Sequence, residues 1–237
     1  MIPWVQLDTA TMPGGGELRL KRRGGEFSIM SGAIELMNSR VSGSEQALAT
    51  VACERIRGRG RPHLLIGGLG MGFTLRAALA GGLPAESRIT VAELVPAVVD
   101  WARGPLAEVF GDSLTDPRVD IRVADVSDLI GGGRATWDAI LLDVDNGPEG
   151  LTRAANDGLY DVAGLGAAKR ALKPGGILAV WSAGPDRSFT QRLRKVGFAV
   201  EEMRARAVHG GGGARHVIWV ATGTGVRPRP MSPPRRA

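Results

Sequence analysis

The chain has 237 residues and a formal net charge of +6, and 43% of its residues are hydrophobic and 23% charged. This composition excludes general disorder, and the length suits one domain of roughly 100 to 200 residues with a small appendage. A single cysteine, Cys53, excludes a disulfide framework and a thiolate metal cluster. The three histidines share no ligand spacing, so we expect no metal site.

The two ends of the chain bear on location and partners. The first residues lack the basic and apolar regions of a signal peptide, and no stretch approaches the roughly 18 apolar residues of a membrane span. We therefore expect a cytoplasmic protein with no membrane partner. Residues 226–237 contain four arginines, four prolines and no acid. This composition predicts a disordered tail over residues 224–237, and we expect no nucleic-acid partner, because the tail carries most of the net charge.

The first 40 residues are predicted to form a small antiparallel β unit. Apolar and polar residues alternate over residues 17–37, and Gly24 and Gly25 supply a turn, with a second break at Gly32. Apolar residues then recur at helical spacing over residues 44–56, where Ser44 is a suitable N-cap.

From His63 onward, short apolar strands alternate with helices. The strands are expected at residues 64–66, 89–92, 119–123, 139–142 and 177–181, and two further runs at 199–207 and 216–221 predict a closing antiparallel hairpin. Alternation of this kind indicates βαβ units and a parallel sheet covered on both faces. The predicted fold class is α/β, with a Rossmann-like, doubly wound, mostly parallel sheet over residues 41–223.

A glycine-rich turn is the strongest local signal for a ligand. Gly67, Gly68, Gly70 and Gly72 follow an apolar strand and open a helix, so that backbone can approach a ligand closely. Glu93 ends the next strand, where a carboxylate can accept hydrogen bonds from both ribose hydroxyls. This order of elements predicts a nucleoside site.

Two more strands end in acidic residues. Asp125 follows the third strand and is placed to accept a hydrogen bond from an adenine amino group, although it is also a suitable helix N-cap. Asp143 follows three apolar residues, and Asp145 and Asn146 come after the intervening Val144. A carboxylate there can orient an ammonium and take its proton, which makes Asp143 and Asp145 catalytic candidates. The alternative is a simple turn over residues 145–148.

Together these residues resemble those of class I S-adenosylmethionine-dependent transferases. The resemblance rests on the glycine turn, Glu93, Asp125, the Asp143-Val144-Asp145 run and the later Leu172-Lys173-Pro174-Gly175-Gly176 run. The β unit followed by residues 35–46 is similar to the spermidine synthases, and the resemblance spans residues 16–221. It implies S-adenosylmethionine or its decarboxylated form as cofactor, a small-molecule amine as acceptor, and a homodimer.

The resemblance also implies residue roles. The cofactor is expected to contact Gln46, Gly67, Gly68, Leu69, Gly70, Gly72, Glu93, Leu94, Asp125, Val126 and Asp143. The acceptor is expected to contact Glu45, Asn146, Tyr160 and Trp181, with a core position as the alternative for Tyr160.

Two positions depart from the synthase pattern. The synthases have a tyrosine where this chain has Glu45, and an aspartate inside the glycine turn where this chain has Gly70. Loss of that aspartate admits a donor that keeps its carboxylate. The expected function is therefore aminopropyl transfer from decarboxylated S-adenosylmethionine to an amine, with methyl transfer on the same scaffold as the alternative. A non-catalytic nucleoside-binding module is the further alternative. A nicotinamide dehydrogenase is disfavoured, because no set of hydride-transfer residues accompanies the glycine turn in this sequence.

Overall fold

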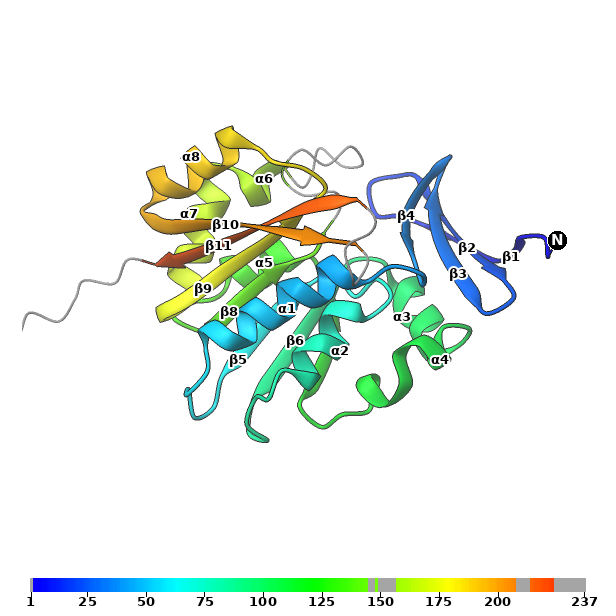
Figure 1. Cartoon of the computed structure of the whole chain (residues 1–237), viewed down its shortest axis with the longest axis horizontal. Coiled ribbons are helices and arrows are strands. Elements are labelled where there is room, and N and C mark those ends of the chain that lie inside the picture. Colours follow the sequence, from blue (N-terminus) through cyan, green and yellow to red (C-terminus); the bar gives the residue numbers. More distant parts are fainter. Residues whose placement is uncertain (1, 145–147, 149–156, 208–213, 224–237) are drawn as a thin grey trace, which may run out of the picture.

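The computed structural model describes residues 2–144, 148, 157–207 and 214–223, which form two β-sheets and their covering helices (Figure 1). The smaller sheet is an antiparallel meander of β1 (Val5–Thr11), β2 (Glu17–Arg23), β3 (Glu26–Ser31) and β4 (Ile34–Asn38). The predicted β unit is thus present, with one more strand than the sequence pattern indicates. The alternation of apolar and polar residues does not predict β1, because almost all its side chains are exposed and its pairing with β2 uses backbone groups.

The larger sheet has seven strands in the order β10-β11-β9-β8-β5-β6-β7. They are β5 (His63–Gly67), β6 (Arg88–Glu93), β7 (Val119–Val123), β8 (Trp137–Leu142), β9 (Leu172–Ser182), β10 (Phe198–Arg206) and β11 (Arg215–Gly223). β5 to β9 pair in parallel, and β10 and β11 close the sheet as an antiparallel hairpin. The predicted doubly wound α/β sheet is confirmed.

Helices cover both faces of this sheet. One face carries α1 (Gly43–Arg55), α2 (Phe73–Ala80) and α3 (Pro96–Arg103), and the other carries α5 (Val126–Gly131), α7 (Val162–Ala171) and α8 (Arg187–Val196). Three short elements complete the set: α4 (Ala107–Phe110), a 3-10 turn (Gly111–Leu114) and α6 (Asp157–Tyr160).

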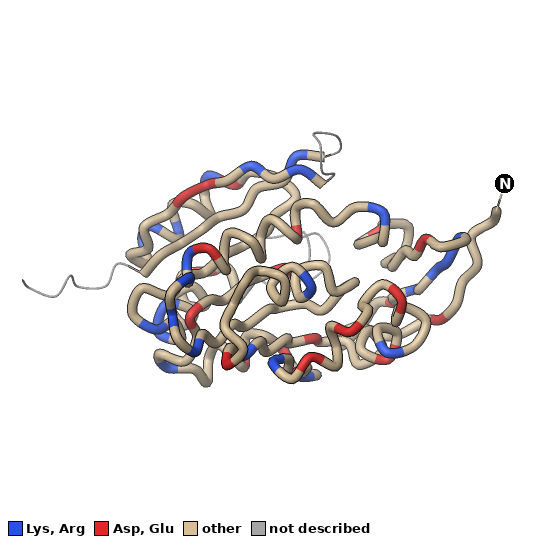
Figure 2. The backbone as a smooth tube through the Cα atoms, turned by 60° about the horizontal axis from the view of Figure 1, so that its bottom comes forward, with Lys and Arg blue, Asp and Glu red and all other residues tan. Residues whose placement is uncertain are grey.

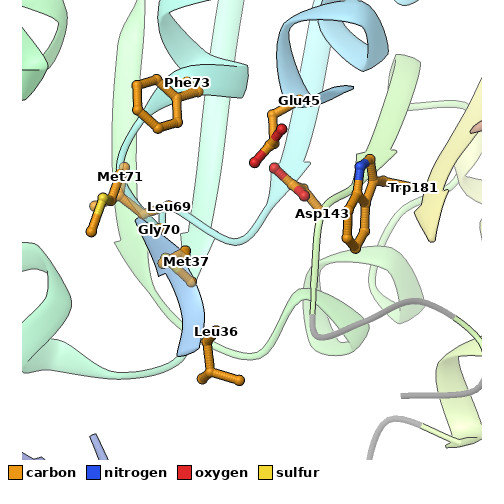
Figure 3. A pocket seen from close by; sticks show the side chains of 9 residues that line it. All are labelled: Leu36, Met37, Glu45, Leu69, Gly70, Met71, Phe73, Asp143 and Trp181. Carbon is orange, nitrogen blue, oxygen red and sulfur yellow. The ribbon is translucent and has the colours of Figure 1, made fainter. Parts of the chain in front are cut away.

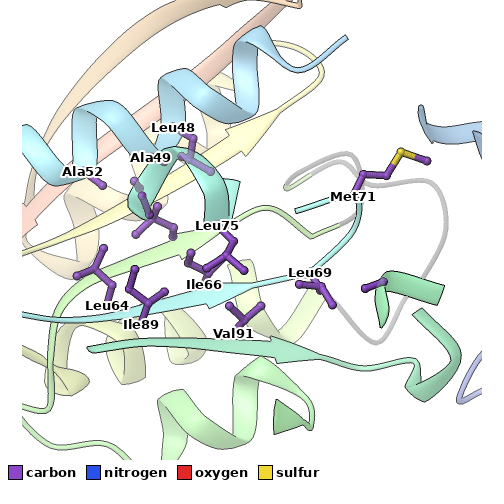
Figure 4. Packing of buried hydrophobic residues seen from close by; sticks show 14 of the residues in the cluster. Leu48, Ala49, Ala52, Leu64, Ile66, Leu69, Met71, Leu75, Ile89 and Val91 are labelled. Carbon is purple, nitrogen blue, oxygen red and sulfur yellow. The ribbon is translucent and has the colours of Figure 1, made fainter. Parts of the chain in front are cut away.

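Alternating side chains of the buried strands divide the core between these two faces. In β5, Leu64 and Ile66 pack with Leu48 and Leu75 from α1 and α2, whereas Leu65 belongs to the core on the opposite face. Figure 4 shows the first of these layers, with α1 and α2 side chains above β5 and β6. Because both strand faces are buried, the strands appear in the sequence as continuous apolar runs.

The strand order places the candidate site. The chain builds β5, β6 and β7 outward, then returns to add β8 on the other side of β5. Ligands of open parallel sheets bind at the carboxyl ends of strands beside such a reversal. Here those ends are the glycine turn after β5 and Asp143 after β8.

The start of α1 differs from the sequence prediction. The helix begins at Gly43 with Ser42 as N-cap, and the Ser44 hydroxyl donates to Glu45 Oε2 instead of capping the helix. The backbone N–H of Gly43 donates to the Ala207 carbonyl beyond β10, and the N-cap lies two residues before the predicted Ser44. The glycine-rich residues 210–213, between the two strands of the predicted hairpin, and the predicted tail at 224–237 lie outside the described residues.

Charged residues of both signs are interspersed along the described chain (Figure 2). None of the helices in that part is long and apolar enough to cross a membrane. Over the same residues, no group of three or more His, Cys, Asp or Glu side chains gathers as a metal site would require.

A buried acid holds the end of the sheet opposite the site. Asp138, on β8, is 2% exposed, and its carboxylate accepts from Arg59 Nη1 at 2.6 Å, Lys173 Nζ at 2.6 Å and the His63 backbone at 2.7 Å. These hydrogen bonds lower the pKa of Asp138 against the opposing effect of burial, which is the largest single influence on it.

We predict that Asp138→Asn lowers the free energy of unfolding by about 2 kcal/mol, because two cations lose their shared partner. Asp120→Asn is the matched control. Its ion pair with Arg122 is half exposed, so we expect a change of about 0.5 kcal/mol or less. Urea unfolding of both variants checks the difference, and equal losses would contradict the assigned role of Asp138.

Candidate functional site

The glycine turn is hydrogen-bonded to the strands on both sides of it. Gly68 N donates to the Ala92 carbonyl at 2.8 Å, and Asp143 N donates to the Gly67 carbonyl at 3.0 Å. Gly68 has a φ of +91°, and a Cβ at this position would collide with the Asp143 carbonyl. Only glycine allows this approach. The turn therefore brings the ends of β5, β6 and β8 together.

Glu93, at the end of β6, is fixed by the backbone of that turn. The side chain is 8% exposed, and its two oxygens accept from Leu69 N and Val95 N, each at 2.9 Å. Burial raises the pKa of Glu93, and the backbone N–H groups oppose that shift. The backbone N–H groups of Gly70 and Leu94 also interact with this carboxylate, so the turn and the start of the next loop hold it at the end of the strand.

Two cavities open over the strand ends. The first, which we call the Glu93 cavity, is lined by Met12, Met37, Gly68, Gly70, Ala92, Glu93, Leu94, Val95, Ala124, Asp125, Val126, Asp143 and Val144. The second, the Glu45 cavity, is lined by Leu36, Met37, Glu45, Leu69, Gly70, Met71, Phe73, Asp143 and Trp181 (Figure 3). Met37, Gly70 and Asp143 line both, so the cavities adjoin at Asp143.

Asp125 caps a helix and also lines one of the two cavities. Its Oδ1 accepts from Ser127 N at 2.8 Å, so it is the N-cap of α5. The residue also lines the Glu93 cavity. A capping carboxylate has a second oxygen, which is available to a ligand in that cavity.

Asp143 and Glu45 point toward one another across the Glu45 cavity (Figure 3). Thr74, in the first turn of α2, donates its hydroxyl to Asp143 Oδ2 at 2.6 Å. Burial, and then the negative charge of Glu45, raise the pKa of Asp143 to about 7, while the Thr74 hydrogen bond opposes the shift. Asp143 can therefore gain or lose a proton near neutral pH.

Some candidate residues lie elsewhere. Gln46 lines another surface cavity with Thr50, Phe73 and Arg76, which meets the Glu45 cavity at Phe73, and its amide donates to Ser42 Oγ at 2.9 Å. Tyr160 is 3% exposed and packs edge-on against Phe189 in the core, its hydroxyl donating to the Val144 carbonyl at 3.4 Å.

Of the remaining described candidates, some line a cavity and others lie behind the lining. Leu69, Leu94, Val126 and Trp181 line one of the two cavities. Gly67 and Gly72 do not appear in either lining, and a Cβ at these positions would meet Val126 and Phe110 respectively. Asp145 and Asn146 lie outside the described residues.

Sequence reasoning missed several residues of the site. Thr74 follows the glycine turn, as the second residue of α2, which was a usable signal for a contact with Asp143. Met12, just after β1, and Met37, in β4, lie at least 30 residues before Gly67, and no local pattern connects them to the turn.

We predict that Gly68→Ala lowers the free energy of unfolding by about 2 to 5 kcal/mol, because its Cβ meets the Asp143 carbonyl and its φ is positive. Gly82→Ala is the control, since Gly82 has a φ of +70° but no atom within 4 Å of its Cβ position, and it should cost about 1 kcal/mol. Denaturant unfolding measures both, and equal losses would show that the close approach is unimportant.

A second prediction concerns pH. Asp143 has a pKa near 3.8 when unfolded and about 7 when folded, so the folded protein binds more protons between these values. Its contribution to stability is complete below about pH 4 and is lost as the pH rises through 7. In Asp143→Asn, unfolding free energies measured at pH 5 and pH 8 should therefore differ less than in the unchanged protein, by about 1 kcal/mol or more. An unaltered pH difference would contradict the raised pKa.

Comparison with known proteins gives matches in sequence and in structure. The chain is 33% identical over 150 residues to a polyamine aminopropyltransferase of Mycobacterium tuberculosis and 34% identical over 125 residues to one of Nitrosomonas europaea. These matches cover 59% and 53% of the chain, but only 27% and 36% of the relatives' own length. No protein-family model matches.

The structural matches extend further. Spermidine synthase from Thermotoga maritima superposes with a TM-score of 0.72 at 17% identity, covering 92% of this chain and 72% of the other. A probable spermidine synthase from Corynebacterium glutamicum gives a TM-score of 0.62 at 16% identity, over 92% and 79% of the two chains. The chain thus has the fold of the spermidine synthases, and its sequence resembles that of polyamine aminopropyltransferases, as the motifs predict.

Proposed function

We propose that this protein transfers an aminopropyl group from decarboxylated S-adenosylmethionine to an amine acceptor. The observation that carries the proposal is the position of Asp143, at the junction of the Glu93 and Glu45 cavities. A transferase needs its donor and acceptor to meet at one point, next to a group that orients the nucleophile. A similarity to polyamine aminopropyltransferases supports the same reaction.

The Glu93 cavity suits the nucleoside part of the donor. Glu93 would accept the ribose hydroxyls, and Asp125 would accept from the adenine amino group. Leu94 and Val126, the residues that follow these acids, would flank the adenine ring. Gly68 and Gly70 both line this cavity, so the backbone of the turn would lie beside the donor.

The donor, when bound, supplies a carbon attached to a sulfonium, so that a C–N bond forms as the C–S bond breaks and sulfur keeps the electron pair. The protein's part is to bring in the amine and remove its proton. Asp143, with its pKa raised to about 7, can take a proton from an ammonium at neutral pH and return it to water afterwards. Thr74 holds the carboxylate in place through its 2.6 Å hydrogen bond.

The charges of the Glu45 cavity favour the decarboxylated donor over the intact one. Glu45 and Asp143 are the ionisable groups in its lining, and both are acids. They would attract the ammonium at the end of an aminopropyl group and repel the carboxylate of intact S-adenosylmethionine. This supports aminopropyl transfer even though the turn carries Gly70 in place of the synthases' aspartate.

The homodimer and the cytoplasmic location stay predictions. Exposed apolar side chains on the small sheet, among them Val5, Leu7 and Ile34, are compatible with a partner surface there.

The test is a calorimetric titration with decarboxylated S-adenosylmethionine, the intact molecule and NAD, followed by product analysis with aliphatic amines. We expect the decarboxylated donor to bind at least about tenfold more tightly than the others, a difference of about 1.4 kcal/mol. Tighter binding of the intact donor, with methylated products, would overturn the proposal in favour of methyl transfer.

Two variants separate the roles within the same assay. Glu93→Gln should weaken donor binding by about tenfold or more, while Asp143→Asn should mainly lower turnover with donor binding retained. Similar, small effects of both variants would contradict the assigned roles.

A further inference from the structure

We infer that Glu45 is a second anchor for the acceptor's ammonium, opposite Asp143, and that His216 positions it through Ser44. This inference rests on the proposed function, and it assigns a role to three residues, two of which no motif in the sequence indicates. The acceptor class that fits is an aliphatic primary amine that enters as its ammonium.

A continuous chain of hydrogen bonds runs from β11 to the cavity. Ser44 Oγ lies 2.7 Å from Glu45 Oε2 and 2.8 Å from His216 Nδ1. Ser44 itself is fully buried at the start of α1. These hydrogen bonds therefore link β11, in the antiparallel part of the large sheet, to a carboxyl group inside the site.

The direction of each of these hydrogen bonds follows from the protons that the three side chains can donate. A serine hydroxyl has one proton, and a carboxylate can only accept, so Ser44 donates to Glu45. Ser44 must then accept from His216, which requires the proton on Nδ1. Burial lowers the pKa of His216, with the Glu45 charge opposing it, so the neutral Nδ1–H form is available at neutral pH.

Aromatic packing holds the histidine in this orientation. The His216 ring lies 4.7 Å from the Trp181 ring, centroid to centroid, at an interplanar angle of 63°. Trp181 in turn forms a wall of the Glu45 cavity. A change at His216 therefore reaches the cavity in two ways, through the Trp181 contact and through the hydrogen bonds to Glu45, and a test must separate them.

Within the described part of the chain, no lysine or arginine pairs with Glu45 or Asp143. Among the described residues, neither carboxylate forms an ion pair with a lysine or arginine, and each accepts only from a neutral hydroxyl, that of Ser44 or Thr74. Two facing acids without a cationic partner leave uncompensated negative charge in the cavity. An ammonium between them would neutralise it and hydrogen-bond to both.

The rest of the cavity suits an alkyl chain. Its other walls include Leu36, Met37, Met71 and Phe73, which offer apolar surfaces to methylene groups. An aliphatic amine presents the same combination of one charged head and an apolar body. Glu45 thus explains how the site functions without the tyrosine that the synthases have at this position.

The experiment measures binding of 1,4-diaminobutane and of butylamine to protein saturated with methylthioadenosine, by calorimetry, together with the acceptor KM. Glu45→Gln should weaken amine binding by about tenfold to a hundredfold, with methylthioadenosine affinity unchanged. Glu54→Gln is the control, since it makes the same charge change at an exposed position of α1.

His216→Phe tests the positioning role, because it keeps an aromatic ring beside Trp181 and removes the hydrogen bond to Ser44. It should weaken amine binding less than Glu45→Gln does. The double variant should bind amine no more weakly than Glu45→Gln alone, because His216 acts through Glu45. Additive losses would show a separate structural role and overturn the positioning claim.

The outcomes keep the two proposals apart. Amine binding by the unchanged protein without transfer of an aminopropyl group would refute the proposed function and leave the anchor intact. Unaltered amine binding in Glu45→Gln, or failure of the unchanged protein to bind either amine, would overturn the anchor.

Discussion

The close backbone approach between the β5 turn and the end of β8 is the constraint on which the site depends. Gly67 and Gly68 hydrogen-bond to β8 and β6 through Asp143 N and the Ala92 carbonyl. With no Cβ at Gly68, the turn lies directly against the Asp143 backbone. The same turn also supplies Leu69 N to the carboxylate of Glu93. One glycine turn therefore sets the positions of Glu93 in one cavity and of Asp143 where the two cavities adjoin.

The two acids on or beside β8 have pKa shifts of opposite direction, because their surroundings differ. Asp138, at one end of the strand, is neutralised by Arg59 and Lys173, and its pKa is lowered. Asp143, just past the other end, faces the acidic Glu45 and has its pKa raised to about 7. A carboxyl with cationic partners stabilises a fold, whereas one held beside another acid is ready to exchange a proton or bind a cation.

Much of the site was predictable because its main residues end successive strands. Glu93 ends β6, and Asp125 and Asp143 come just after β7 and β8; parallel strands bring such ends to one edge of the sheet. Gln46 and Ser44 were harder to place, because a helix presents neighbouring residues to different surroundings. Gln46 lines another cavity, and Ser44 hydrogen-bonds to the side chain beside it instead of capping the helix.

The amino-acid sequence by itself determined the doubly wound fold, the glycine turn and the acids at the strand ends, because these depend on local periodicity and on turns that only glycine allows. Only the tertiary structure decided which distant residues complete the site. Met37 of the small sheet lines both cavities, and His216 of the last strand reaches Glu45 through Ser44. Such contacts arise from packing between elements far apart in the chain, and the spacing of side chains along one element does not predict them.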